Sequence, residues 1–222
     1  MSENLMRTVS SLFLVVVVTF LGYWLVLDER KHSKAIAYTQ RGDVLSELKR
    51  YDEAIEHYRQ AINIKSNYVE AYNNLANALG KKGKIKESIA YYNEAIRFKS
   101  DYAEAYNNLG IALSGLGQFE EAIEQYQKAL EINPDLFQAH NSLAILLARQ
   151  GDFSGAIEHY QQAITFYPGF AKAHNNLGSA LAGQGRFEEA MVHFQWAINI
   201  DPHYTDARKN LEFARSLAEK RR

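Results

Sequence analysis

Side-chain amides recur at fixed intervals along most of the chain, and they carry the clearest hydrogen-bonding chemistry in the sequence. The segments AYNNLANAL, AYNNLGIAL and AHNNLGSAL each contain two adjacent asparagines, which begin at Asn73, Asn107 and Asn175. A side-chain amide both donates and accepts hydrogen bonds. Asparagines held at one height can therefore pair with the N–H and C=O groups of an extended peptide without reading its side chains. The sequence predicts a binding site for polypeptide backbone.

The elements that position these amides repeat with a period of 34 residues. Gly110 and Gly178 occupy equivalent places in two nearly identical segments 68 residues apart, and a related segment lies midway. Self-similarity at one fixed period is typical of a stacked solenoid and not of a globular domain with an active site. Five repeats follow, and we number positions 1 to 34 within each: 35–68, 69–102, 103–136, 137–170 and 171–204.

Each repeat is predicted to be a helical hairpin, because it contains two apolar stripes of helical period. In the first half, positions 4, 7 and 11 share one face; in the second half, small residues at positions 20 and 27 mostly flank an aromatic ring at position 24. Glycine at position 15 suits a left-handed helix end, and proline at position 32 ends the second helix. These residues are Gly83, Gly117, Gly151 and Gly185, and Pro134, Pro168 and Pro202.

The last hairpin needs a cover, because a solenoid exposes an apolar face at each end. Residues 205–222 are predicted to supply a capping helix followed by a basic tail in solvent. Its buried stripe is expected to consist of Ala207, Leu211, Ala214 and Ala218. Val192 and Trp196, which lie on the second helix of the fifth repeat, are expected to pack beneath this helix; the alternative is an exposed docking spot.

The predicted peptide-binding groove lies on the first helix of each repeat. Positions 2, 6, 9 and 13 face away from the buried stripe, with position 5 at its flank; we call this the first-helix surface. It is a polar amide ladder with a small apolar centre. The predicted site residues are Asn73, Asn74, Asn77, Asn107, Asn108, Ile111, Asn141, Ile145, Asn175, Asn176 and Ser179. Glu70 and Glu104 at position 2, against Arg149 and Lys172 further along, suggest that charge orients the bound segment.

This pattern resembles the tetratricopeptide repeat (TPR) family, whose 34-residue period and L-G, Y, A, F, P signature it matches over about three quarters of the chain. Ala76 and Ala144 depart from the glycine of position 8, and Arg41 from the leucine of position 7. The resemblance implies an all-α fold with a right-handed solenoid of five hairpins, to which the residues themselves add a capping helix and a preceding transmembrane helix. It also implies protein binding without catalysis.

Within the family, the asparagine ladder is similar to the TPR region of O-GlcNAc transferase, where such a ladder holds the backbone of substrate polypeptides. An alternative is that asparagine at position 6 is ordinary consensus that ties one hairpin to the next. The family's dicarboxylate clamp for acidic chaperone tails needs basic residues at positions 5 and 9. Those positions hold Asn, Thr, Asp, Ile and Ser here, which disfavours that clamp.

An apolar stretch near the amino terminus predicts attachment to a membrane. Residues 1–8 form a short tail, and residues 9–27 contain no charge and span roughly 28 Å as a helix, which is enough for one bilayer crossing. Residues 28–34 are expected to form a juxtamembrane linker. A cleaved signal peptide is the alternative, but charged residues follow the stretch instead of a cleavage site. Excess basic charge after it favours a single-pass protein with its repeats in the cytoplasm.

Catalytic and metal-binding constellations are absent from the sequence. The histidines share repeat positions, so that their spacing comes from the repeat and not from metal ligation. There is no cysteine, no HExxH, no serine elbow and no phosphate-binding glycine loop. The formal net charge of -1 disfavours a nucleic-acid partner. We expect no enzyme activity, no cofactor, no metal and no small-molecule substrate.

The sequence therefore predicts a membrane-anchored adaptor that binds protein or peptide partners in its groove. It resembles anchored TPR factors that assist photosystem I assembly, and also bacterial envelope assembly adaptors, which implies a role in assembling a membrane protein complex. Two alternatives remain open at this point. One is a substrate-delivery subunit of a separately encoded enzyme such as a glycosyltransferase, and the other is a self-assembling scaffold.

Overall fold

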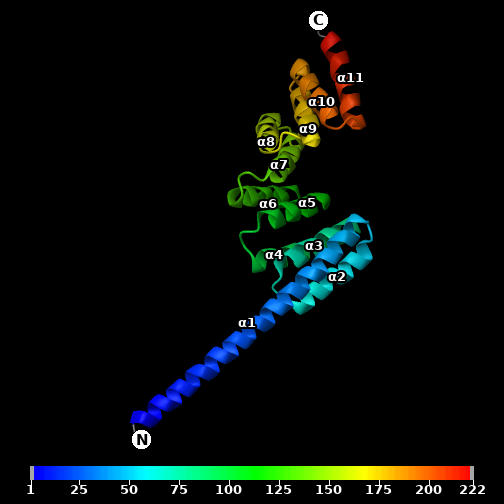
Figure 1. Cartoon of the computed structure of the whole chain (residues 1–222). Coiled ribbons are helices and arrows are strands. Elements are labelled where there is room, and N and C mark those ends of the chain that lie inside the picture. Colours follow the sequence, from blue (N-terminus) through cyan, green and yellow to red (C-terminus); the bar gives the residue numbers. More distant parts are fainter. Residues whose placement is uncertain (1–2, 221–222) are drawn as a thin grey trace. The chain divides into compact units, whose positions relative to one another are not determined.

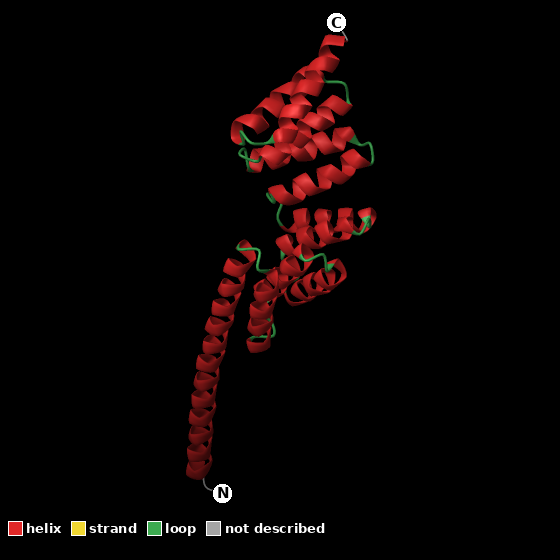
Figure 2. Ribbon diagram, turned by 90° about the vertical axis from the view of Figure 1, so that its right-hand side faces the viewer, coloured by secondary structure: helices red, strands yellow, loops and turns green. Residues whose placement is uncertain are grey.

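The computed structural model describes the backbone of residues 3–220 and the side chains of residues 16–220. Over this range the chain forms eleven α-helices and no strand (Figures 1 and 2). The all-helical class and the hairpin solenoid are thus confirmed. The helices are α1 (Glu3–Glu47), α2 (Tyr51–Ile64), α3 (Val69–Lys81), α4 (Ile85–Phe98), α5 (Ala103–Gly115), α6 (Phe119–Ile132), α7 (Phe137–Arg149), α8 (Phe153–Phe166), α9 (Ala171–Gly183), α10 (Phe187–Ile200) and α11 (Thr205–Lys220).

The chain divides into two compact units, residues 1–94 and 95–222, with the boundary inside α4. The first unit contains α1, α2, α3 and most of α4. The second contains the end of α4 and the helices from α5 to α11. In both units the helices pair as the repeat predicts, with one hairpin in each 34-residue period.

The turn inside each hairpin is the same in all five repeats. Position 15 has a positive φ, between 75° and 86° at its four glycines. The next N–H donates to the carbonyl of the leucine at position 11, as in Gln118 to Leu113 at 3.1 Å and Arg186 to Leu181 at 3.0 Å. These bonds satisfy carbonyls that the helix end would leave unpaired. Lys49 occupies this position in the first repeat with φ 59°, although it is not glycine.

The two helices of a hairpin approach closely where a glycine at position 8 lies under the ring at position 24. A Cβ atom built on Gly110 would lie 2.5 Å from Tyr126 Cε1, and one on Gly178 would lie 2.7 Å from Phe194 Cε1. Gly42 meets Tyr58 in the same way. The rings Tyr58, Tyr126 and Phe194 are buried as a result. The second and fourth repeats have buried alanines here, so their rings sit beside a methyl group.

The capping helix forms as predicted and closes the second unit. Ala207, Ala214 and Ala218 are buried, and Leu211 packs against the cluster that contains Phe194. Val192 and Trp196 are exposed, with 54% and 53% of their surfaces accessible, so the prediction that they pack beneath α11 is wrong. Trp196 instead stacks on His174, with ring centroids 6.1 Å apart.

Helix α1 differs from the expected arrangement, because one helix runs from Glu3 to Glu47 (Figure 1). Residues 28–34, where we expected a linker, are helical. They contact the first hairpin through an Asp28–Lys65 ion pair at 3.4 Å and an edge-on contact of His32 with Tyr68.

Within the described residues, no helix has an apolar stretch long enough to cross a bilayer. The predicted span 9–27 lies in α1. Residues 9–15 of that span, the predicted tail 1–8 and the end of the basic tail are outside the residues whose side chains the structure describes.

Candidate first-helix binding surface

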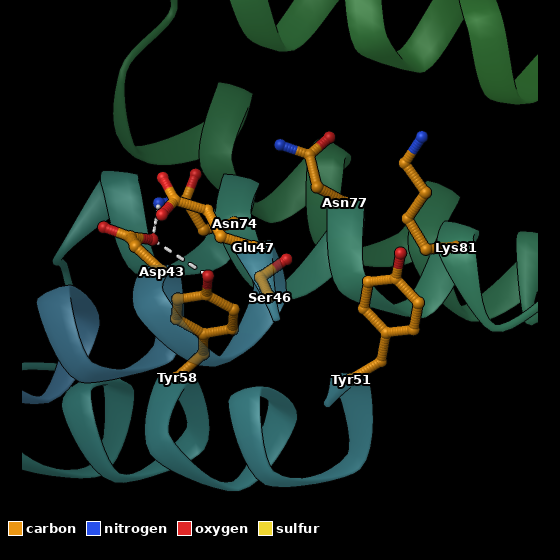
Figure 3. A pocket seen from close by; sticks show the side chains of 8 residues that line it. All are labelled: Asp43, Ser46, Glu47, Tyr51, Tyr58, Asn74, Asn77 and Lys81. Carbon is orange, nitrogen blue, oxygen red and sulfur yellow. Dashed lines mark hydrogen bonds between the residues drawn. The ribbon is translucent and has the colours of Figure 1, made fainter. Parts of the chain in front are cut away.

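In the first unit, the first-helix surface contains an open, polar cavity of about 460 Å³. Figure 3 shows Asp43, Ser46 and Glu47 of α1 facing Asn74, Asn77 and Lys81 of α3, above Tyr51 and Tyr58 of α2. Two carboxylates and one ammonium group line it. The cavity suits a polar or basic segment better than an apolar one.

Asp43 is the hydrogen-bonding centre of this cavity. Its Oδ1 accepts from the Tyr58 hydroxyl at 2.8 Å and from Asn74 Nδ2 at 2.9 Å (Figure 3). Burial, together with the bond to Asp43, raises the pKa of Tyr58 above its ordinary value, so the phenol stays a donor. In the second repeat, the Tyr92 hydroxyl donates to Asn77 Oδ1 at 2.5 Å. Position 9 therefore anchors the ring of its own hairpin in both cases.

In the third and fourth repeats, which belong to the second unit, position 9 carries isoleucine, and the first-helix surface is more apolar there. Ile111 is 51% exposed and Ile145 is 43% exposed. They line an open cavity of about 350 Å³ together with Tyr126, Asn141, Ser142, Lys172, Asn176 and Tyr204. The structure thus brings together four of the predicted site residues, namely Ile111, Asn141, Ile145 and Asn176. Burial raises the pKa of Tyr126 to about 12, so this phenol is neutral.

The asparagines at position 5 lie inside the stack and not on its surface. Asn73, Asn107, Asn141 and Asn175 are all less than one tenth exposed. Asn73 donates to Asn74 at 3.1 Å, and Asn175 donates to Asn176 at 3.4 Å. The side-chain amides of Asn73 and Asn175 are therefore engaged by neighbouring side chains. The residues of the predicted ladder that are open to a partner are therefore those at positions 6 and 9, and most clearly Ile111, Ile145 and Ser179.

Asparagine at position 6 bonds to the preceding hairpin in the second and fifth repeats, and we call this bond the amide tie. Asn74 donates to Asp43 in the preceding repeat, and Asn176 donates to Asn141 at 3.2 Å. Asn210 of the capping helix donates to Asn175 at 2.9 Å in the same manner. The alternative reading of position 6 as an inter-hairpin tie is thus supported. Asn210 was missed in the sequence, although it occupies position 6 when the period is continued past residue 204.

The amide tie is missing between the third and fourth repeats, where position 6 is Ser142. By the pattern of Asn176 and Asn210, Asn107 Oδ1 should accept from this side chain, but it is buried without a partner within the described structure. The serine side chain is shorter than that of asparagine and does not bond to Asn107. Ser142 instead lines the cavity beside Ile145. The break and the cavity therefore coincide.

A second cavity of the second unit was not foreseen. It measures about 300 Å³ and lies between α9, α10 and α11, with Ser179, Phe187, Asn210, Phe213 and Leu217 among its lining residues. Phe213 is 64% exposed, and it occupies position 9 of the continued period. The signal was available in the sequence, since α11 follows the spacing of a first helix.

Lys172 and Arg149, two of the four charged residues predicted to orient a ligand, differ from each other in their surroundings. Lys172 lines the cavity with Ile145 and makes no ion pair in the part of the chain that the structure describes. The guanidinium of Arg149 instead lies over the Phe119 ring, 4.0 Å from its centroid. Lys172 is therefore the cation available to a partner at this cavity.

Histidines at positions 4 and 23 form a bonded pair in each of the fourth and fifth repeats. The Nδ1 atoms of His140 and His159 are 2.9 Å apart, and His140 Nε2 lies 2.9 Å from the Pro134 carbonyl. His174 and His193 repeat this arrangement at 3.3 Å. Burial lowers the pKa of His159, His174 and His193. The described residues contain no cluster of three or more metal-ligating side chains.

Comparison with protein families matches repeat models along most of the chain. A model described as TPR repeat matches residues 42–83, and two described as tetratricopeptide repeat match residues 67–135, 101–169 and 141–205. The comparison with curated proteins finds no match.

Solved structures with the same hairpin fold are similar over most of their lengths. One is a crystal structure of the MamA protein, 27% identical with a TM-score of 0.61, over 76% of this chain and 92% of that chain. Another is YrrB, described as a TPR protein with an unusual peptide-binding site, 26% identical with a TM-score of 0.59, over 84% and 96%. A thermophilic TPR protein of Thermus thermophilus is 22% identical with a TM-score of 0.68, over 81% and 98%, and shares the fold.

Proposed function

Since the chain belongs to the tetratricopeptide repeat family, we propose that it is a non-catalytic adaptor that binds extended segments of protein partners on its first-helix surface. The observation that carries this proposal is the open cavity where Ile111 and Ile145 are exposed beside polar groups. Apolar side chains that a fold leaves uncovered next to hydrogen-bonding groups are typical of binding sites. The likeness to YrrB, which is described as having a peptide-binding site, supports the same class of ligand.

We also propose that α1 anchors the adaptor in a membrane, with its repeats in the cytoplasm, where it recruits partners for the assembly of a membrane protein complex. Apart from the half-buried Val17, every large apolar side chain from Val16 to Leu27 is at least 37% exposed, and Phe20 and Tyr23 reach 68% and 66%. These residues point in all directions around the helix. A helix that is apolar all round needs an apolar environment.

Quantitative affinity purification from detergent tests the adaptor role. We expect Ile145→Arg to lose the partners recovered with the wild-type chain, because it places a charge in the apolar centre of the cavity. Val192→Arg is the matched control, since Val192 is also exposed but lies on α10, away from this cavity. Equal loss in both variants, or retention in both, would refute the proposed surface. Recovery of a catalytic polypeptide alone would indicate a delivery subunit, and homo-oligomers alone would indicate a scaffold.

A further inference from the structure

We infer that the second unit selects an extended segment with two apolar side chains about four to six residues apart and an acidic residue beside the first. This inference rests on the proposed function and specifies its ligand. The first apolar side chain would enter the cavity at Ile111 and Ile145. The second would enter the cavity at Phe213.

The two cavities open on the same side of one helix. Asn176 lines the first cavity and Ser179 lines the second, and both residues belong to α9. Residues three apart on a helix are neighbours on one face. A segment that crosses α9 on this face therefore meets both cavities.

The first cavity combines apolar and polar lining residues at the place where the amide tie is missing. Ser142 replaces the asparagine that would reach back toward Asn107, and Ile111 and Ile145 replace the polar residues found at position 9 of the first two repeats. The second cavity is framed by Phe187, Phe194 and Phe213. Each can hold one apolar side chain, which gains free energy in proportion to the area removed from water.

The spacing of the two apolar side chains follows from helix geometry. The helices α7, α9 and α11 are packed in succession, and packed helices lie about 8–10 Å apart. The first cavity is centred on α7 and the second lies between α9 and α11, so one and a half to two steps, roughly 12–20 Å, separate them. An extended chain advances about 3.3 Å per residue, which gives an interval of about four to six residues.

The charge preference follows from Lys172. It is the one charged residue that lines the first cavity, and no charged residue lines the second. Its ammonium group has no carboxylate partner among the described side chains. Lys172 is exposed, so an aspartate or glutamate next to the first apolar residue can reach it and supply that partner.

Selection from a phage library of random twelve-residue peptides on the full chain in detergent micelles tests the inference. We expect enrichment of peptides with two apolar residues at the stated interval and an acidic residue beside the first. Lys172→Glu, which copies Glu104 at the same repeat position, should replace the acidic preference by a basic one. Lys209→Glu, at an exposed site outside both cavities, should select the same peptides as the wild-type chain.

Direct binding of the best enriched peptide, followed by fluorescence anisotropy, locates the two apolar contacts. Ile145→Asn copies Asn77, and Phe213→Ser copies Ser179, so both substitutions are already compatible with the repeat. Each should weaken binding about tenfold, because burial of a large apolar side chain is lost. Val192→Asn on α10 should leave the affinity unchanged.

The outcomes separate this inference from the proposed function. Peptides that are enriched without the apolar interval, or a Lys172→Glu selection identical to that of the wild type, would overturn the inference and leave peptide binding intact. No enrichment of any peptide by the folded chain, judged by far-UV circular dichroism, would overturn both.

Discussion

Glycine at position 8 sets how closely the two helices of a hairpin approach. A methyl group on Gly110 would meet the Tyr126 ring at 2.5 Å and the Ala122 carbonyl at 3.1 Å. We expect Gly110→Ala to lower the free energy of unfolding by about 1–3 kcal/mol through overpacking. Gly115 lies at the end of the same helix, and a Cβ atom there would have nothing within 4 Å. Gly115→Ala should therefore be neutral or stabilise by up to about 1 kcal/mol, and equal urea midpoints for the two variants would contradict the packing argument.

The amide tie between hairpins makes a second prediction. Asn176→Ser should reproduce the defect present at Ser142, because Asn141 Oδ1 would lose its donor at 3.2 Å while remaining buried. An unsatisfied buried acceptor costs about 1–3 kcal/mol. Asn199 Oδ1 accepts a hydrogen bond from Gln195 Nε2 at an exposed site, so Asn199→Ser should shift the free energy of unfolding by less than about 0.5 kcal/mol. Urea denaturation of the three proteins measures the difference.

The asparagines show what the sequence could and could not establish about the site. Their positions and period were readable, because amide pairs recur in nearly identical segments. The sequence did not show in which direction each amide points, since positions 5 and 6 are adjacent and either can face the neighbouring hairpin. In the structure Asn73 is buried, and Asn74 donates a hydrogen bond to Asp43 of the preceding repeat. The isoleucines of position 9 are exposed, as the predicted apolar centre requires, and their side chains cannot form hydrogen bonds to a neighbouring hairpin.

At the level of the hairpin turn, Lys49 is the one described residue other than glycine with a positive φ. A side chain in the left-handed region costs roughly 1–2 kcal/mol, which glycine avoids. We therefore expect Lys49→Gly to raise the free energy of unfolding by about 1 kcal/mol. Lys49→Ala removes the charge but keeps Cβ, so it should not stabilise. If both variants melted at the same temperature, backbone conformation would not be the cause.

The paired histidines predict a pH dependence of stability in the second unit. Since His159, His174 and His193 have folded pKa values below the ordinary 6.5, the unfolded chain binds more protons near that pH. Stability should then be full above about pH 6.5 and fall as the pH decreases toward the folded values. Glu158 and Glu189 oppose the shift only in part.

Substitutions that copy other repeats test this dependence. His140→Tyr with His159→Gln, and His174→Tyr with His193→Gln, reproduce Tyr106 and Gln125 of the third repeat. Together they should flatten the urea midpoint between about pH 7.5 and pH 5.5. Tyr72 makes the corresponding bond to the Ser66 carbonyl at 2.9 Å, so Tyr72→His with Tyr91→His should steepen the profile. An unchanged slope in both sets would show that the pairs do not titrate on folding.

The helices were predictable from the sequence wherever a stop signal was present. Glycine at position 15 and proline at position 32 mark helix boundaries that the structure reproduces. The sequence predicted a linker at residues 28–34 because this run is polar, but in the structure these residues belong to the single helix α1. The run contains neither glycine nor proline, and its charged residues have good helix propensity. The helix therefore continues through it without a break.

The chain contains TPR repeats and, in α1, a run of exposed apolar residues that we propose as a membrane anchor. The anchor would determine where in the cell the protein meets its partners. Exposed apolar residues occur in two parts of the first unit. Leu21 and Leu25 are 52% and 56% exposed in the proposed anchor, whereas Val44 and Leu48 are 57% and 61% exposed in the first hairpin and its turn. The two pairs therefore offer matched substitutions.

Leu21→Lys with Leu25→Lys should release the protein from membranes during carbonate extraction, because each lysine in a bilayer costs about 2.5–3.5 kcal/mol. Val44→Lys with Leu48→Lys should leave it in the membrane pellet, since those residues are proposed to lie in water. Digestion of sealed vesicles should remove the repeats only when their cytoplasmic face is outward. Quantitative extraction of the wild-type chain would refute the anchor, and protection of the repeats in such vesicles would reverse the proposed orientation.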